Sequence, residues 1–305
     1  MSVSEALLEQ VARLYADGRN RRRGESDSFP FELWTKVDEL GLPLAMCPES
    51  SGGSGLRWTE MFDVMAHAAS CGEPLPLGET FVGNLILCEN GLAPADGPIF
   101  FHAPTFNVPA TGRLLVVEGG GVRLASPSAG GQPLGTIPAG AGAIAQAGAL
   151  LRTIQIAGAL QGALDLSVRY AQERVQFGRP LSKFQAVQQM LAQLAGEVEA
   201  AGAAARTACA KMDAGDGMLA IAISKVRAGL AVQKGAMLAH QIHGAIGVTL
   251  EYPLARLSCQ MWQWVEEFGG QRYWAATLGR ASVGAGSAWD IIVAASDPVG
   301  DLGHE

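Results

Sequence analysis

The stretch that decides the fold is residues 169–188, Arg-Tyr-Ala-Gln-Glu-Arg-Val-Gln-Phe-Gly-Arg-Pro-Leu-Ser-Lys-Phe-Gln-Ala-Val-Gln. A helix-compatible segment stops at Gly178, Pro180 follows two residues later, and a second helical pattern starts near Phe184. A glycine followed closely by a proline is typical of a helix end and a sharp turn. The stretch therefore predicts two long helices joined by a rigid corner.

The corner carries cationic, amide and aromatic side chains close together along the chain. They are Arg174, Gln176, Phe177, Arg179 and Gln185. A guanidinium group can hold a phosphate through two parallel hydrogen bonds, while an aromatic ring packs against an apolar face of the same ligand. The alternative interpretation is that an arginine at the C-terminal end of a helix only complements the helix dipole.

A second segment, residues 240–253, reads His-Gln-Ile-His-Gly-Ala-Ile-Gly-Val-Thr-Leu-Glu-Tyr-Pro and also predicts a helix stopped by glycines. In this order, the two segments resemble the C-terminal helical domain of the acyl-CoA dehydrogenase superfamily. Its motifs are Arg-x-Gln-Phe-Gly and Gln-x-x-Gly-Gly-x-Gly, and they reach across a subunit interface to the pyrophosphate and adenosine end of FAD. The residues that the resemblance assigns to cofactor binding are Arg174, Gln176, Phe177, Gln185, Gln241, Gly244 and Ala245, with Ala245 in place of the second glycine.

Composition narrows the class of protein. Of the 305 residues, 49% are hydrophobic and only 17% are charged, which favours a large core with extensive subunit interfaces and excludes a disordered chain. A net charge of −7 argues against a nucleic-acid partner. Charges such as Lys225 and Arg227 interrupt the apolar runs before the ~20 residues that a membrane span needs.

The N-terminus and the cysteines predict a cytoplasmic protein without a metal site. Glu5 and Glu9 lie where a signal peptide requires cations, and the five cysteines are scattered without a Cys-x-x-Cys pair. His240 and His243 are three residues apart on a predicted helix, but no third metal ligand of suitable spacing accompanies them.

The sequence predicts a mostly α, multi-domain α+β fold with three parts. Residues 1–92 form an N-terminal helical domain, with apolar periodicity over 3–16, 28–40 and 59–70. Residues 93–146 form a small antiparallel β-unit with strands at 113–118 and 121–125, much reduced from the β-domain that the family resemblance implies. Residues 147–305 form an antiparallel four-helix bundle, whose last three helices are expected at 184–213, 219–242 and 257–281.

The catalytic base that the resemblance implies is missing. Acyl-CoA dehydrogenation removes a proton from the α-carbon, and a carboxylate is the usual base. When the family pattern is laid on residues 249–280, the base position falls on Phe268, and the alternative position used by other members falls on Leu151-Arg152. The remaining candidates are Glu266, Glu267 and Glu251. We assign Glu267, one residue from the expected place, against the alternative that it is an exposed acid at a helix end.

The residues that would contact the dinucleotide end of FAD are therefore present, whereas those that would hold the flavin ring, the thioester and the base are eroded. This pattern resembles the short subunits that pair with a catalytic chain in heteromeric acyl-CoA dehydrogenases of bacterial steroid side-chain breakdown. The implied function is a subunit of an FAD-dependent acyl-CoA dehydrogenase, in a homo-oligomer or a heterotetramer with a second such chain. The alternatives are a self-sufficient homomeric dehydrogenase with a displaced Glu base and a non-enzymatic assembly subunit.

Overall fold

The computed structural model describes residues 2–21, 29–102, 110–118, 121–125, 133–137, 140–249, 251–285 and 287–296. Helices dominate, and the predicted mostly α fold with a small β-unit is confirmed. The chain forms two compact units, Met1–Ala68 with Glu73–Leu151, and Ala69–Gly72 with Arg152–Glu305. The first unit contains both the N-terminal helices and the strands, and the division into three domains at residues 92 and 146 stays a prediction.

The first unit begins with four helices, α1 (Val3–Arg21), α2 (Phe31–Glu39), α3 (Trp58–Ser70) and α4 (Leu77–Glu89). The first three lie where the apolar periodicity places them, although the expected start of α2 at Ser28 lies outside the described residues. Helix α4 was not predicted. Most of its residues are buried, so polar and apolar positions do not alternate with a helical period that the sequence could reveal.

The β-unit is a four-stranded sheet in the order β1-β2-β3-β4, formed by β1 (Ile99–Phe100), β2 (Arg113–Glu118), β3 (Gly121–Ala125) and β4 (Pro133–Ile137). The last three strands are antiparallel as predicted, but β1 pairs in parallel with β2, with Ile99 opposite Arg113. The prediction of a purely antiparallel unit is therefore wrong at this edge.

Strand β1 is fixed by its contact with α4. The Ile99 N–H donates to Thr80 Oγ1 at 3.0 Å, and the absence of a side chain at Gly83 lets the Ile99 side chain approach, since a Cβ there would lie 2.7 Å from Ile99 Cδ1. This local packing sets the direction of β1, and that direction cannot be predicted from strand propensity alone.

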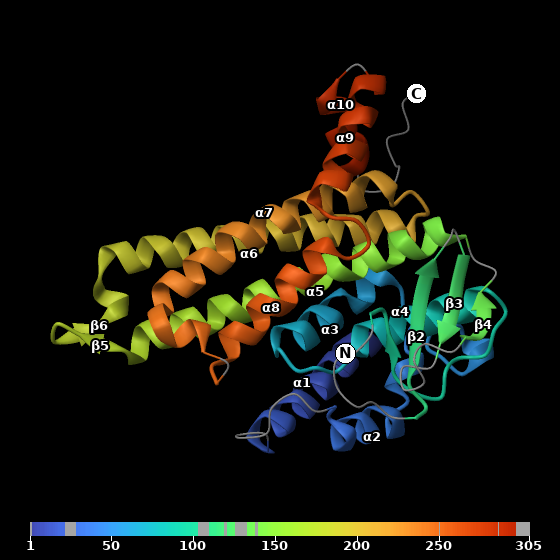
Figure 1. Cartoon of the computed structure of the whole chain (residues 1–305), viewed down its shortest axis with the longest axis horizontal. Coiled ribbons are helices and arrows are strands. Elements are labelled where there is room, and N and C mark those ends of the chain that lie inside the picture. Colours follow the sequence, from blue (N-terminus) through green and yellow to red (C-terminus); the bar gives the residue numbers. More distant parts are fainter. Residues whose placement is uncertain are drawn as a thin grey trace. The chain divides into compact units, whose positions relative to one another are not determined.

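The second unit is built on long helices that lie side by side in Figure 1: α5 (Ala141–Glu173), which enters from the first unit, α6 (Gln185–Asp213), α7 (Met218–His243) and α8 (Pro253–Glu266). A two-stranded hairpin of β5 (Val175–Gln176) and β6 (Arg179–Pro180) joins α5 to α6 at one end. Helices α9 (Gln271–Ala285) and α10 (Ala288–Ser296) follow.

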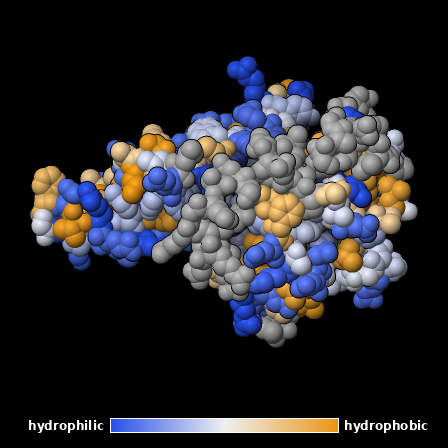
Figure 2. Space-filling view, turned by 60° about the horizontal axis from the view of Figure 1, so that its bottom comes forward, coloured by the Kyte–Doolittle hydropathy of each residue, from blue (hydrophilic) through white to orange (hydrophobic). Residues whose placement is uncertain are grey.

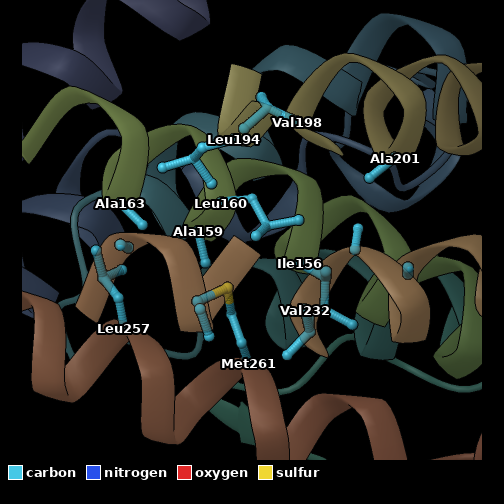
Figure 3. Packing of buried hydrophobic residues seen from close by; sticks show 14 of the residues in the cluster. Ile156, Ala159, Leu160, Ala163, Leu194, Val198, Ala201, Val232, Leu257 and Met261 are labelled. Atoms are coloured by element: carbon cyan, nitrogen blue, oxygen red, sulfur yellow. The ribbon is translucent and has the colours of Figure 1, made fainter. Parts of the chain in front are cut away.

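The bundle core is made of small and branched side chains from four helices that point toward one another (Figure 3). It includes Leu160 of α5, Leu194 of α6, Val232 of α7 and Met261 of α8, each completely or almost completely buried. Alanines and glycines between them allow the helix backbones to approach closely. Gly235, for example, would place a Cβ only 2.7 Å from Leu160 Cδ2.

The predicted fourth bundle helix, residues 257–281, is wrong in one respect, because the structure divides it into α8 and α9. The break consists of residues 267–270, called here the α8–α9 turn. Phe268 and Gly269 have φ values of 54° and 95°, in the left-handed region that ends a helix. The Gly269-Gly270 pair indicated this break in the sequence, but the apolar periodicity on both sides of the pair favoured one continuous helix.

One helix among the described residues, Gly142–Glu173, is long and apolar enough to cross a membrane by length and composition. Of its most apolar window, 83% is buried inside the protein, as is usual for a core helix. This observation is weak support for a membrane span.

We expect Gly162→Ala to destabilise the protein by about 1–3 kcal/mol, because a Cβ on this buried glycine of α5 would lie 2.4 Å from the carbonyl oxygen of Ser70. The matched control is Gly196→Ala on α6, where no atom lies within 4 Å of the added Cβ, so helix propensity should raise stability by about 0.5–1 kcal/mol. Urea denaturation followed by circular dichroism measures both. If Gly162→Ala were as stable as the wild type, the close approach of α5 at Gly162 to the backbone of Ser70 would be contradicted.

Candidate functional site

The predicted corner is a tight β-hairpin. Val175 pairs with Pro180 and Gln176 with Arg179, which leaves Phe177 and Gly178 as a two-residue turn with φ values of 51° and 77°. Two positive φ values are the signature of a type I′ turn, whose first position usually carries Asn or Asp. A phenylalanine there is strained by about 1 kcal/mol or more, and such strain is concentrated at functional sites.

The hairpin carries an aromatic side chain, Phe177, in its turn and a cationic side chain, Arg179, directly after the turn. The guanidinium of Arg179 lies 4.1 Å from the centroid of the Phe184 ring, and Phe177 meets the same ring edge to face at 6.3 Å. The Phe177 side chain is nevertheless 92% exposed. In Figure 2, hydrophobic and hydrophilic side chains lie intermixed at the left-hand end, the end that carries β5 and β6 in Figure 1.

Arg174 lies directly after the last residue of α5, and its side chain is exposed. Only its backbone N–H contributes to the helix end, by donating to Tyr170 O at 2.9 Å. Within the part of the chain that the structure describes, the guanidinium has no hydrogen-bond or ion-pair partner. Its five donors face water and are available to an anion. Gln185, at the start of α6, is also exposed, and Gln176 is partly buried.

The second predicted segment ends α7. Gly244 has a φ of 64°, followed by a short 3₁₀ turn over Gly244–Val248, and Gln241, Gly244 and Ala245 are all exposed. His243 is 3% exposed, and its Nδ1 lies 2.8 Å from Ala239 O. Since a carbonyl only accepts, Nδ1 carries the proton, and Nε2 accepts from the Tyr252 hydroxyl at 3.1 Å.

His243 therefore braces the backbone and does not face a ligand. Burial lowers its pKa, which keeps the imidazole neutral. Its ring stacks on Tyr170 of α5 at 4.7 Å, so the ends of α5 and α7 lie together. The two segments that the sequence singled out are thus brought to the same end of the second unit.

The two histidines that the sequence analysis considered as metal ligands have other partners. His240 Nε2 lies 2.8 Å from Ser258 Oγ, and both nitrogens of His243 are engaged as described. In the described ranges, no group of three or more His, Cys, Asp or Glu side chains is arranged to hold a metal ion.

A second cluster surrounds the α8–α9 turn, where the sequence analysis sought the base. Arg152 of α5 is completely buried, its Nε donates to Glu267 Oε2 at 2.6 Å, and its Nη2 lies 2.5 Å from the same oxygen in an ion pair. Its Nη1 donates to Gln155 Oε1 at 2.5 Å. The rings of Trp264 and Phe268 lie against the guanidinium, with centroids 5.8 and 5.9 Å away.

Glu267 is consequently engaged through both carboxylate oxygens, because Oε1 accepts from Gln263 Nε2 at 2.8 Å. Neutralising this carboxylate would leave the Arg152 charge buried without a counter-charge, which is strongly unfavourable. Glu266 and Glu251, the other candidate acids, are exposed.

Lys225 of α7 completes this cluster. It is 2% exposed, and its Nζ donates to the backbone carbonyls of Trp264, Val265 and Glu267 at 3.1, 3.0 and 2.8 Å. Burial, followed by the nearby Arg152 charge, lowers the pKa of Lys225 to about 8, although Glu267 and Glu266 act in the opposite direction.

No role of Arg152 or Lys225 was predicted from the sequence. The available signal was a single charge within an apolar, small-residue helical segment, as in Ala149-Leu-Leu-Arg152-Thr-Ile154 and Ile221-Ala-Ile-Ser-Lys225. A charge in such a position is rarely buried without a partner.

Comparisons with known proteins identify the fold. Residues 3–92 match the N-terminal domain of acyl-CoA dehydrogenases, and residues 143–266 match the C-terminal domain. Together, the two matches cover well over half of the chain. The chain belongs to the acyl-CoA dehydrogenase family. The resemblance stated from the motifs is confirmed, and FAD is the cofactor of this family.

Individual relatives match between about a third and most of the chain. Glutaryl-CoA dehydrogenase of Desulfococcus multivorans is 46% identical over 101 residues, which is 32% of this chain and 26% of that protein, so the chain spans about a quarter of this relative. The ChsE4-ChsE5 complex from Mycobacterium tuberculosis has a TM-score of 0.77 at 18% identity, over 93% of this chain and 98% of the other. A variant of the Tcur3481-Tcur3483 steroid acyl-CoA dehydrogenase has a TM-score of 0.75 at 22% identity, over 93% and 99%.

We expect Glu267→Gln to lower the free energy of unfolding by on the order of 3 kcal/mol, because it removes the counter-charge of buried Arg152 while keeping the size of the side chain. Glu266→Gln, one residue away and exposed, is the control and should change stability by less than about 0.5 kcal/mol. Urea denaturation compares the two variants. If both were equally stable, Glu267 would not be an anchor and would remain available as a base.

Proposed function

We propose that this acyl-CoA dehydrogenase family chain is a subunit that completes the FAD site of a second, catalytic chain. The observation that carries the proposal is a contrast within the second unit. The hairpin and the end of α7 present exposed groups suited to a dinucleotide, whereas position 268 carries a phenyl ring and Glu267 is held by Arg152.

The side chains at this end of the bundle fit the pyrophosphate and adenosine end of FAD. Arg174 offers a guanidinium to the phosphates, Gln176, Gln185 and Gln241 offer amides, and the exposed Phe177 ring offers an apolar face. Gly244 and Ala245 expose backbone without a bulky side chain. When bound, FAD supplies the acceptor for the hydride that leaves the β-carbon of the acyl thioester.

The proton from the α-carbon needs a base of another origin. A phenyl ring at position 268 accepts no proton, and Glu267 already neutralises a buried guanidinium. A base supplied by a second chain satisfies the chemistry without disturbing this pair. Two structural neighbours, the ChsE4-ChsE5 complex and the Tcur3481-Tcur3483 steroid acyl-CoA dehydrogenase, are each named for two components, which supports a two-chain assembly for this chain.

The proposed reaction is α,β-dehydrogenation of an acyl-CoA thioester by the assembled enzyme. The proposed partners are the acyl-CoA and a second acyl-CoA dehydrogenase chain, with bacterial steroid side chains as the acyl class that the sequence resemblance favours. The proposed location is the cytoplasm, in keeping with the scattered free cysteines.

We expect Arg174→Ala to weaken FAD retention by the assembled protein about tenfold or more, because it removes a charge-assisted phosphate contact. The matched control is Arg206→Ala, an exposed arginine on α6 at a distance of about 30 Å along the helix from Gln185. Flavin absorbance near ~450 nm after dialysis measures the retained cofactor. Unchanged FAD content in Arg174→Ala would contradict the proposed contact between Arg174 and the FAD phosphates.

We expect a steroid side-chain acyl-CoA to bleach no flavin in this chain purified alone, because its own turn carries no free carboxylate at position 268. Mixing with a catalytic family chain should restore flavin binding and bleaching, recorded near ~450 nm. Bleaching by the isolated chain would favour a homomeric dehydrogenase with a displaced base. A complex that forms but never holds flavin would favour a non-enzymatic assembly subunit.

A further inference from the structure

Helices α9 and α10 stand out from the long helices of the second unit (Figure 1, red). The start of α9 is anchored, because Gln233 of α7 donates to Gln271 Oε1 at 3.0 Å and the buried Trp274 donates through its Nε1–H to Phe268 O at 3.1 Å. Beyond this anchor, most of the described side chains of the two helices are exposed. The bundle therefore holds α9 at its start, while the chain leaves much of the surface of both helices uncovered.

The exposed large side chains of α9 and α10 are apolar and have helical spacing. Tyr273 and Val283 lie within about 80° of each other around α9, and Trp289, Ile292 and Val293 are three and four residues apart on α10. We call these five residues the α9–α10 face. Val283 is 85% exposed and Trp289 is 69% exposed. Apolar side chains gathered on a surface in this way are typical of an interaction site.

The area of the α9–α10 face is suited to a pair of protein chains. The exposed fractions of its five side chains leave roughly 400 Å² of apolar surface, with about 200 Å² for a whole aromatic side chain and about 100 Å² for a branched aliphatic one. A standard interface takes about 800 Å² from each partner, and about 60% of it is apolar. The face therefore supplies most of the apolar area that a stable pair needs from one side.

The face and its borders are complementary to themselves. Trp289 is bulky, whereas Ala276 and Gly279 on the exposed side of α9 are small, and a Cβ added at Gly279 would meet no atom within 4 Å. Both signs of charge are also present. Among the described residues, the Asp290 carboxylate has no hydrogen-bond or ion-pair partner, and the Arg280 guanidinium donates only to a threonine of its own helix at 3.2 Å.

We propose that the α9–α10 face is a self-association surface, which pairs with the same face of a second copy of this chain about a two-fold axis. In such a pair each surface meets itself, so one chain must supply both the bulky and the small side chains and both signs of charge. The face lies away from the β5–β6 hairpin in Figure 1 and shares no residue with the groups assigned to the dinucleotide. The proposal therefore depends neither on flavin nor on a catalytic partner chain.

Sedimentation velocity of the isolated full-length chain tests the pairing without any cofactor. At a concentration of tens of micromolar, we expect a mass of at least twice the monomer mass of 31.8 kDa. A wild-type chain that sediments as a monomer would overturn the proposal, and would leave the face to a different protein.

Two variants test whether this face forms the pair. Trp289→Ala removes a tryptophan, the residue type most often found to dominate binding energy, and Val283→Asp places a charge in the apolar contact. We expect each variant to raise the dissociation constant about thirtyfold or more, and so to halve the sedimenting mass. Val3→Asp is the matched control, because Val3 is a 61% exposed valine on α1 of the first unit. Circular dichroism checks that all three variants fold, and wild-type association of Trp289→Ala and Val283→Asp would overturn the proposal.

A charge reversal distinguishes pairing of the face with itself from pairing with another part of the chain. Asp290→Arg leaves only positive charges beside the face, together with Arg280, so two such faces repel each other. We expect the dissociation constant to rise several-fold at low ionic strength and to return towards the wild-type value at about 1 M salt, where the charges are screened. Association of Asp290→Arg that equals the wild type at low salt would mean that the face does not meet itself.

Discussion

The second unit depends on how the buried end of one short helix is satisfied. Helix α8 ends where Trp264 and Val265 are buried, and the chain then reverses over four residues. The ammonium of Lys225 and the guanidinium of Arg152 satisfy this end from two other helices, one through backbone carbonyls and the other through Glu267. Removal of either cation would leave buried polar groups unpaired, which is among the most unfavourable changes in a protein interior.

This constraint also separates the two regions of the unit that bear on function. At one end of the bundle, side chains are exposed and engaged in few internal contacts, as Arg174 and Phe177 illustrate, and they are suited to a ligand or to another chain. Around the α8–α9 turn, every polar group of Glu267 and Lys225 is used internally. A chain arranged in this way can contribute to a cofactor site without performing the proton transfer, which is the physical basis for the proposed subunit role.

Most of the second unit could be predicted from the sequence around the family motifs. The long helices α5, α6 and α7 and the corner between α5 and α6 follow from helix periodicity and from glycine and proline signals, which act locally. The same local rules failed at Gly269-Gly270, where a strong apolar period continued on both sides of a real break. They also failed at α4, whose burial on most sides removes the period, and at β1, whose direction depends on its packing against Thr80 and Gly83.

By itself, the sequence determined the fold class, the family and the absence of a carboxylate at position 268, because composition, motif order and residue identity do not depend on the conformation of the chain. Only the tertiary structure decided that Glu267 pairs with Arg152, that Lys225 closes the end of α8, and that His243 braces Tyr170 and Tyr252. Each of these contacts joins residues that are far apart in the chain or on different helices. The energy of a buried charge is set by the partners that folding places around it, and residue order alone does not specify those partners.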